Sequence, residues 1–235
     1  MIKVTNLAKS FPRQTVLENV NFEAREGRRV LILGKSGSGK SVFLKCILGL
    51  LVPDTGSVMI DSTNVTSLMT RPRLKRKLTK VRQRIGYVFQ GSALLDSLTV
   101  EENIDLALEY KRLPRHERIE IIDQKLELVG LSKDVRRKYP EHLSGGMKKL
   151  VAIARAIAAD PKYVFYDEPT TGLDPVMVMR ITGLIIELSE RLEITSLVVT
   201  HDMGLARRAG QDIYFLKNYT LSRPKKTTRL EELYE

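Results

Sequence analysis

The sequence predicts one α/β domain built around a parallel β-sheet. Three short apolar segments, RRVLILG at 28–34, KYVFYDEP at 162–169 and TSLVVTHD at 195–202, each end in glycine or polar residues. Strands that are buried in a parallel sheet have this pattern. Longer amphipathic segments separate these apolar ones, and no internal repeat or low-complexity tract interrupts the chain.

Length and composition exclude several classes of protein. A chain of 235 residues has room for one domain or two closely joined subdomains, and its 43% hydrophobic and 29% charged residues suit a globular protein. No stretch approaches the ~18 consecutive apolar residues that span a bilayer, and the start, MIKVTNLAKS, lacks the apolar core of a signal peptide. These features predict a protein that stays in the cytoplasm.

The net charge indicates which classes of partner the chain can bind, and the single cysteine bears on disulfides and metal sites. The net charge of +11, from 39 Lys and Arg against 28 Asp and Glu, favours nucleotides, nucleic acid or anionic lipid surfaces without choosing between them. Cys46 lies in the apolar run SVFLKCILGL, where we expect a small buried core residue. The composition therefore predicts neither a disulfide nor a zinc site.

The middle of the chain, roughly residues 91 to 142, predicts a helical insertion. TVEENIDLALEYKRL and RHERIEIIDQKLELVGL have the composition of helices. Thr99 stands at an N-cap position with Glu102 at capping-box spacing, and Gly130 is typical of a helix stop.

GKSGSGKS, at 34–41, fits the phosphate-loop pattern G-x-x-x-x-G-K-[ST] between a predicted strand and a predicted helix. Its glycines allow backbone N–H groups and the helix N-terminus to point at phosphate oxygens. This motif predicts a P-loop NTPase core, and at this point kinases and GTPases remain open. The expected nucleotide contacts are Gly34, Lys35, Ser36, Gly37, Ser38, Gly39, Lys40, Ser41 and Val42.

The chemistry expected at this loop is that of a nucleoside triphosphate and Mg²⁺. Lys40 reaches the β- and γ-phosphates, and the Ser41 hydroxyl is a ligand of the magnesium ion. Asp167 holds the metal, while Glu168 orients or deprotonates the attacking water as general base. These residues follow buried strands, and ligands of open α/β sheets bind beyond the carboxyl ends of the strands, so we expect them to converge with His201 in one crevice.

HLSGGMKK, at 142–149, resembles the signature motif of ABC-type ATPases and precedes the strand that carries YVFYDEP. The resemblance covers nearly the whole chain. It implies a P-loop NTPase core with a parallel sheet, an ABC-type antiparallel β subdomain and a helical subdomain that carries the signature. The chain, 1–235, is then one ABC ATPase domain, with a catalytic core at about 1–90 and 160–235 and the helical subdomain at about 91–159.

The resemblance also assigns roles around the nucleotide. It places Phe11 at the position that stacks on adenine, a contact worth ~1 to 3 kcal/mol for aromatic platforms. Gln90 contacts magnesium and water and senses the partner at the helical insertion. His201 contacts the γ-phosphate and positions the attacking water. His116 and His142 lack such a context, and we expect them to face solvent.

A second copy of the chain completes each site in this family. Ser144, Gly145 and Gly146 are expected to bind the γ-phosphate held by that copy, with N–H groups at a helix N-terminus. Asp174 belongs to the loop that couples the two sites. The resemblance thus implies a homodimer with two composite ATP sites that closes on ATP and reopens after hydrolysis.

The subfamily prediction is an ATPase subunit that powers phospholipid or other lipid transport. FQGSALLDSLTVEEN and LSGGMKKLVAIARAI, with Met147 where many importers carry glutamine, resemble ATPases of mammalian-cell-entry (MCE) lipid transporters. The implied partners are an integral membrane permease, docked near Gln90, and an MCE-type lipid-binding subunit. The implied location is peripheral, at the cytoplasmic face of the inner membrane.

Two alternatives stay open. One is the ATPase of a small-solute ABC importer, and the other is a soluble ATPase that acts on nucleic acid. No DNA- or RNA-reading module supports the second, so we expect no specific nucleic acid partner. The basic run RPRLKRKLTKVRQR, at 71–84, suits anionic headgroups or acidic permease loops, and equally a solvated helix face.

Overall fold

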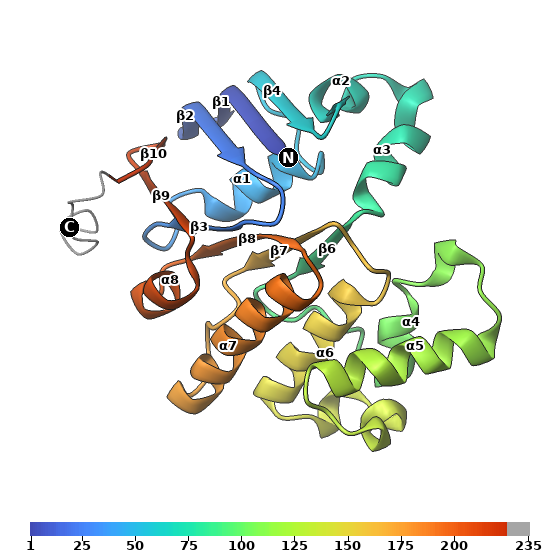
Figure 1. Ribbon diagram of the computed structural model, residues 1–235. Coiled ribbons are helices and arrows are strands. Elements are labelled where there is room, and N and C mark those ends of the chain that lie inside the picture. The colour runs from blue at the N-terminus through green and yellow to red at the C-terminus, as the bar shows by residue number, and fades with distance from the viewer. Residues whose placement is uncertain (225–235) are drawn as a thin grey trace.

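A computed structural model describes residues 1–224 and shows two β-sheets with helices around them (Figure 1). The larger sheet has the strand order β10-β9-β3-β8-β7-β6, in which all neighbours are parallel except β9 and β10. The smaller, antiparallel sheet has the order β2-β1-β4-β5. The strands are β1 (Ile2–Phe11), β2 (Gln14–Ala24), β3 (Arg29–Leu33), β4 (Thr55–Ile60), β5 (Thr63–Asn64), β6 (Ile85–Val88), β7 (Tyr163–Asp167), β8 (Thr195–Thr200), β9 (Asp212–Lys217) and β10 (Thr220–Ser222).

Alternate residues of the parallel strands serve two hydrophobic cores. Val30 and Ile32 of β3 pack with α1 and the antiparallel sheet, whereas Leu31 packs with the helices on the opposite face. Side chains of a strand alternate between the two faces of a sheet. This explains why the predicted segments are continuously apolar, and it confirms the α/β fold with a parallel and an antiparallel sheet. Cys46 of α1 lies fully buried in the first core, where burial raises the pKa of its thiol to about 11.

Helices cover one face of the larger sheet and extend from it on the side of α4 and α5 (Figure 1). The α-helices are α1 (Lys40–Ile47), α2 (Val65–Met69), α3 (Lys75–Arg82), α4 (Val100–Asp105), α5 (Arg115–Leu128), α6 (Gly145–Ile157), α7 (Pro175–Arg191) and α8 (Met203–Ala209). The 3₁₀ helices are η1 (Pro72–Leu74), η2 (Glu109–Lys111), η3 (Lys133–Arg137) and η4 (Pro140–His142).

The helical insertion contains shorter helices than the sequence predicts. Thr99 caps α4 in a full capping box with Glu102, and Gly130, with a φ of +72°, follows the end of α5. TVEENIDLALEYKRL, however, is wrong as a single helix, because α4 ends at Asp105 and Arg112 adopts a left-handed conformation. The division at 91–159 stays a prediction, and the last part of the proposed core, 225–235, lies outside the described residues.

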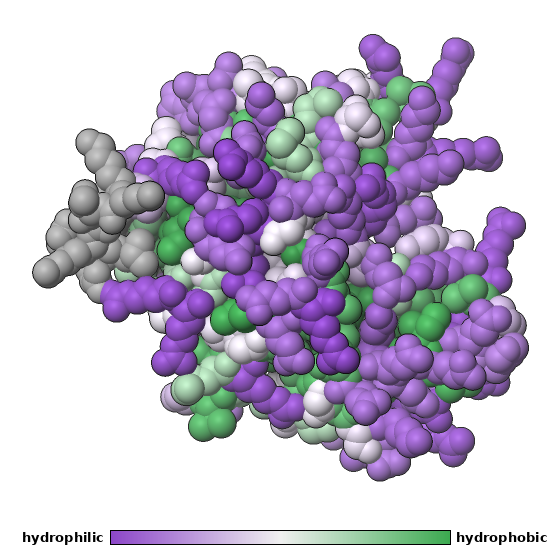
Figure 2. Space-filling view, viewed as in Figure 1, coloured by the Kyte–Doolittle hydropathy of each residue, from purple (hydrophilic) through white to green (hydrophobic). Residues whose placement is uncertain are grey.

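No helix among residues 1–224 is long and apolar enough to cross a membrane. The surface seen in Figure 2 is largely hydrophilic, and long polar side chains project from its upper right, over α3. As expected, His116 and His142 are exposed.

Asp61, which follows β4, joins the two sheets. Its carboxylate accepts hydrogen bonds from the amino group of Met1 at 2.9 Å, the Tyr163 hydroxyl at 2.6 Å and Lys162 at 3.1 Å, and it forms an ion pair with Arg84 at 2.9 Å. Partial burial raises the pKa of this carboxyl, but the hydrogen bonds outweigh that effect and hold the pKa well below its usual value. The charged form therefore stabilises the fold.

We predict that Asp61→Asn lowers the free energy of unfolding at neutral pH by about 1 kcal/mol, since partly exposed charge-assisted hydrogen bonds are screened by water. Because the folded pKa is depressed, this stabilisation exists above the ordinary Asp pKa and is lost only as the pH falls through the folded value. Urea denaturation at several pH values measures it. Asp96→Asn, at an exposed position, is the control, and equal stability of the Asp61 variant at neutral pH would contradict the prediction.

Candidate nucleotide-binding site

The phosphate loop lies between β3 and α1, as the sequence predicts. Gly39 has a φ of +102°, and a Cβ there would lie 2.7 Å from the Val16 side chain, so only glycine fits. The Ser38 hydroxyl oxygen is buried and has no hydrogen-bond partner among the described residues. A buried polar atom without a partner is costly and indicates a ligand or a bound water at this loop.

The Lys40 ammonium is held by the loop and by one carboxylate. Its Nζ donates to the carbonyl oxygens of Gly34 at 2.7 Å and Lys35 at 3.0 Å, and it lies 3.0 Å from Glu168 Oε1. The Lys40 and Glu168 side chains are only 5% and 8% exposed. The ion pair is therefore largely shielded from solvent, and its charges interact more strongly than a surface pair.

Glu168 also contacts the residue that the sequence places at the end of β8. Its Oε2 lies 2.7 Å from His201 Nδ1 and accepts a hydrogen bond from the His201 backbone N–H at 3.3 Å. Glu168 has a φ of +49°, a left-handed conformation that a glutamate rarely adopts. Such strain persists only where the surroundings enforce it, and it is common at functional sites.

Asp167 is the second acid of the site. Oδ1 accepts a hydrogen bond from the Ser41 hydroxyl at 2.8 Å, and Oδ2 accepts one from the Tyr87 hydroxyl at 2.9 Å. A hydroxyl and a carboxylate side by side are oxygen ligands of the kind that Mg²⁺ prefers, and Mg²⁺ commonly uses one or two carboxylates together with phosphates. Ser41 and Asp167 therefore fit the predicted magnesium site.

Tyr87 and Lys149 contact the site but are absent from the predicted set. Burial and the Asp167 charge raise the pKa of Tyr87, so its phenol stays a donor. The Lys149 ammonium, 2% exposed, donates to the backbone oxygens of Phe89 at 3.2 Å and Gln90 at 2.6 Å, and burial lowers its pKa to about 8 against the raising effect of Asp167. Lys149 thus ties α6 to the end of β6. Its sequence context is an ordinary helix, whereas Tyr87 shares the strand-like segment GYVFQ with Gln90.

A cavity of about 500 Å³ collects most of the predicted site residues. Phe11 lines it from the end of β1, where its ring is 43% exposed and lies 5.6 Å from the Lys9 ammonium. Gly34, Lys35 and Ser38 belong to the adjoining loop. The residues that line the cavity are Phe11, Gln14, Val16, Ser36, Gly37, Gly39, Lys40, Ser41, Val42, Gln90, Glu168, Thr171 and His201.

The signature residues and Asp174 do not line this cavity. Ser144 Oγ caps α6 by accepting from the Met147 N–H, and Asp174 Oδ1 caps α7 by accepting from the Met177 N–H. A Cβ on Gly146 would lie 2.5 Å from Met177 Cε, so the two helix N-termini are closely packed. Any contact of these residues with phosphate must therefore involve a second chain or a rearrangement.

Together, the strand–loop–helix motif, the buried lysine and the paired hydroxyl and carboxylate define a P-loop nucleotide-binding protein. The family model described as ABC transporter matches residues 17–171. The chain therefore belongs to the ABC transporter family, as its signature motif predicts.

Curated relatives are similar to this chain in sequence over most of its length. The probable ribonucleotide transport ATP-binding protein mkl of Mycobacterium leprae (strain TN) is 37% identical over 216 residues, which is 92% of this chain and 60% of the relative. The methionine import ATP-binding protein MetN of Brucella abortus (strain 2308) is 38% identical over 216 residues, 92% of this chain and 57% of the relative. The chain thus spans less than two thirds of these relatives.

Solved structures share the fold. The dimeric, post-hydrolysis ATP-binding cassette MJ0796 bound to ADP and Pi superposes with a TM-score of 0.86 at 36% identity, over 98% of this chain and 100% of that chain. The cbiO1 structure from Clostridium perfringens, part of the ABC transporter complex cbiONQ, has a TM-score of 0.82 at 29% identity, over 94% of this chain and 86% of that chain. The antiparallel sheet and the helical insertion are therefore features of an ABC cassette.

We predict that Tyr87→Phe weakens Mg²⁺ binding to the nucleotide complex by roughly tenfold or more, because residues that orient a metal-binding carboxylate commonly have effects of this size. A Mg²⁺ titration of a fluorescent ATP analogue bound to the chain measures this. The exposed Tyr139→Phe is the matched control. If the Mg²⁺ concentration at half-saturation is unchanged, Tyr87 has no role in metal binding.

Proposed function

We propose that this chain is the ATP-binding and ATP-hydrolysing subunit of an ABC transporter and powers transport through a separate permease. The observation that carries the proposal is the contact series from Lys40 through Glu168 to His201, beside the phosphate loop. The series brings a lysine ammonium, a carboxylate and an imidazole together in one cavity, which supports phosphate binding by Lys40 and water activation by Glu168. Residues of both proposed core segments, 1–90 and 160–235, contribute to it.

The cavity suits an ATP molecule laid along its length. Phe11 and Gln14 are directly paired residues of β1 and β2 and line the cavity, so the Phe11 ring is accessible to an adenine. The triphosphate is received by the loop from Gly34 to Val42 and by the Lys40 ammonium. Bound Mg²⁺, held by Ser41, Asp167 and Gln90, would neutralise phosphate charge.

The hydrolytic step uses Glu168 and His201. Glu168 accepts a proton from the attacking water, whose oxygen bonds to the γ-phosphorus while the β–γ bridging bond breaks, giving ADP and inorganic phosphate. Phosphate oxygens compete with Glu168 for the Lys40 ammonium, which makes the carboxylate available to the water. His201 is hydrogen-bonded to Glu168 through Nδ1, and in the proposed complex it would contact the γ-phosphate through Nε2.

Two copies of the chain complete the sites. Ser144, Gly145 and Gly146 stand at the N-terminus of α6, whose N–H groups attract anions, and they lie outside their own chain's cavity. Asp174, at the start of the adjoining α7, is the proposed coupling residue. A homodimer that brings these residues onto the partner's γ-phosphate closes on ATP, and this motion performs work on the permease.

We predict that Glu168→Gln binds ATP but lowers turnover by 10²-fold or more, because the amide cannot accept the proton and general-base effects are typically ~10²–10⁴-fold. Glutamine keeps the size of the side chain and two hydrogen-bonding groups. Phosphate release and retention of a fluorescent ATP analogue are measured in parallel, with Thr171→Ser as the control within the same cavity. Near-normal turnover would contradict the role of Glu168 as general base.

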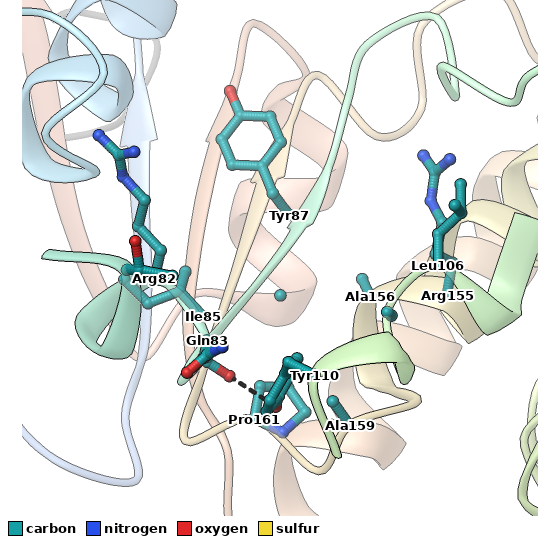
Figure 3. A pocket seen from close by; sticks show the side chains of 13 residues that line it. Arg82, Gln83, Ile85, Tyr87, Leu106, Tyr110, Arg155, Ala156, Ala159 and Pro161 are labelled. Carbon is teal, nitrogen blue, oxygen red and sulfur yellow. Dashed lines mark hydrogen bonds between the residues drawn. The ribbon is translucent and has the colours of Figure 1, made fainter. Parts of the chain in front are cut away.

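A groove of about 410 Å³ supports the permease partner (Figure 3). Its walls come from α3 and β6 on one side, and from the segment after α4, including η2, and from α6 and the residues after it on the other. Leu106 and Tyr110 are 39% and 41% exposed there, and the Tyr110 hydroxyl donates to the Gln83 backbone oxygen. This apolar groove, joined to Gln90 through β6, is the proposed permease contact. Docking there would place the chain peripherally at the cytoplasmic face of the inner membrane.

The relatives and the sequence segments favour different cargoes. The printed names of the relatives concern ribonucleotide and methionine transport, which favour a small-solute importer. The lipid cargo and its MCE-type subunit have support only from the sequence segments around Gln90 and Ser144. We therefore place the small-solute importer first and lipid transport second.

We predict that a membrane permease co-purifies with the tagged chain after gentle extraction, and that Leu106→Glu lowers its recovery at least tenfold, because burying one unpaired carboxylate costs several kcal/mol. Leu95→Glu, at an exposed site outside the groove, is the control. A soluble solute-binding protein in the complex supports the small-solute cargo, whereas an MCE-type subunit with lipid supports the second. Recovery without any permease would contradict the transport proposal.

A further inference from the structure

Exposed basic side chains gather on α3 and on the segment that leads into it. The sequence contains no Asp or Glu between Asp61 and Asp96, so no acid within this segment balances its cations. All of the side chains named next are exposed. We define the α3 basic surface as Arg71, Arg73, Lys75, Arg76, Lys77 and Lys80.

The fold turns these side chains outward. Leu78 and Val81 bury the opposite side of α3 in the core with α1 and the antiparallel sheet. Arg82, at the end of the helix, points inward and donates to the backbone oxygens of Leu48 and Gly49. With α3 fixed in this way, its cations form one projecting surface, seen at the upper right of Figure 2.

The α3 basic surface is electrostatically unfavourable by itself. Its side chains form no ion pair within residues 1–224, whereas the neighbouring Arg84 pairs with Asp61. Lys75, Arg76 and Lys77 occupy the first turn of α3, which contains no acidic residue, so they face the positive end of the helix dipole. Like charges at i, i+4, such as Arg76 and Lys80, add repulsion. An anionic partner would relieve both effects.

We propose that the α3 basic surface docks onto anionic lipid headgroups of the membrane that holds the permease. Thr79 and Arg82 of the same helix line the groove proposed for the permease, so α3 and the permease contact lie together. This step rests on the proposed function. A single-stranded nucleic acid is less well matched, because no aromatic residue occurs from Ser62 to Gly86 and bases would find no stacking platform. A duplex would need only phosphate contacts, and the test below distinguishes it from lipid.

The test is sedimentation of the full chain with vesicles of phosphatidylcholine alone or mixed with phosphatidylglycerol. The chain is expected to partition onto the anionic vesicles only, and less strongly at high salt because salt screens exposed charges. The triple variant Arg73→Gln, Arg76→Gln, Lys77→Gln is expected to partition roughly a hundredfold less, at about fivefold per basic residue near an anionic surface. Equal binding to neutral vesicles, or no binding to either, overturns the proposal.

The matched control removes three cations elsewhere. Lys133→Gln, Arg137→Gln and Lys138→Gln neutralise exposed residues in and beside η3 and change the net charge equally. An equal loss in both variants overturns the proposal, because binding would then depend on net charge alone. Tighter binding of the chain to a DNA or RNA duplex than to vesicles, lost in the α3 variant, also overturns it.

ATP binding by the same variants separates this proposal from the proposed function. The α3 variant is expected to retain a fluorescent ATP analogue like the parent chain, since none of its changed residues lines the nucleotide cavity. Loss of vesicle binding with intact ATP binding supports the proposal that the α3 basic surface docks onto anionic lipid. Failure of every chain to bind ATP contradicts the proposed function and leaves the vesicle result to stand independently.

Discussion

The ion pair between Lys40 and Glu168 is the constraint on which the site depends. Each group is nearly excluded from water, and neither would be stable there without an opposite charge. The pair therefore requires the end of β7, the phosphate loop and the start of α1 to stay in contact. Because the parallel sheet sets the ends of β3, β7 and β8 side by side, that contact also brings His201 to Glu168.

A second set of polar contacts links this site to the helical insertion. Lys149 of α6 bonds the backbone at Phe89 and Gln90, and Arg155 of the same helix bonds the backbone oxygens of Ser92 and Ala93. The segment after β6 is therefore held by the helix that begins at the signature motif. If contact with a second chain displaced α6, these hydrogen bonds would shift Gln90 and the groove beside Leu106.

The sequence predicts the parts of this molecule that local chemistry determines. The phosphate loop, the three strands and the acids after β7 are recognisable because glycine conformation, burial and the strand-to-helix order each require particular residues. The break after Asp105 was not predictable, since the residues that follow include good helix formers and no glycine or proline occurs before Pro114. Tyr87 and Lys149 were missed for a related reason, because only the folded chain shows that Tyr87 reaches Asp167 and Lys149 reaches Gln90.

In the proposed dimer, ATP binds in a cavity of one chain and is enclosed by the signature residues of the other. Light scattering of Glu168→Gln in the presence of Mg²⁺, with and without ATP, measures this most directly. We expect ATP to convert a species of one chain mass, 26.7 kDa, into one of twice that mass, and we expect Ser144→Arg to prevent the conversion while ATP still binds. A chain that holds ATP yet stays at the single mass would contradict the shared site.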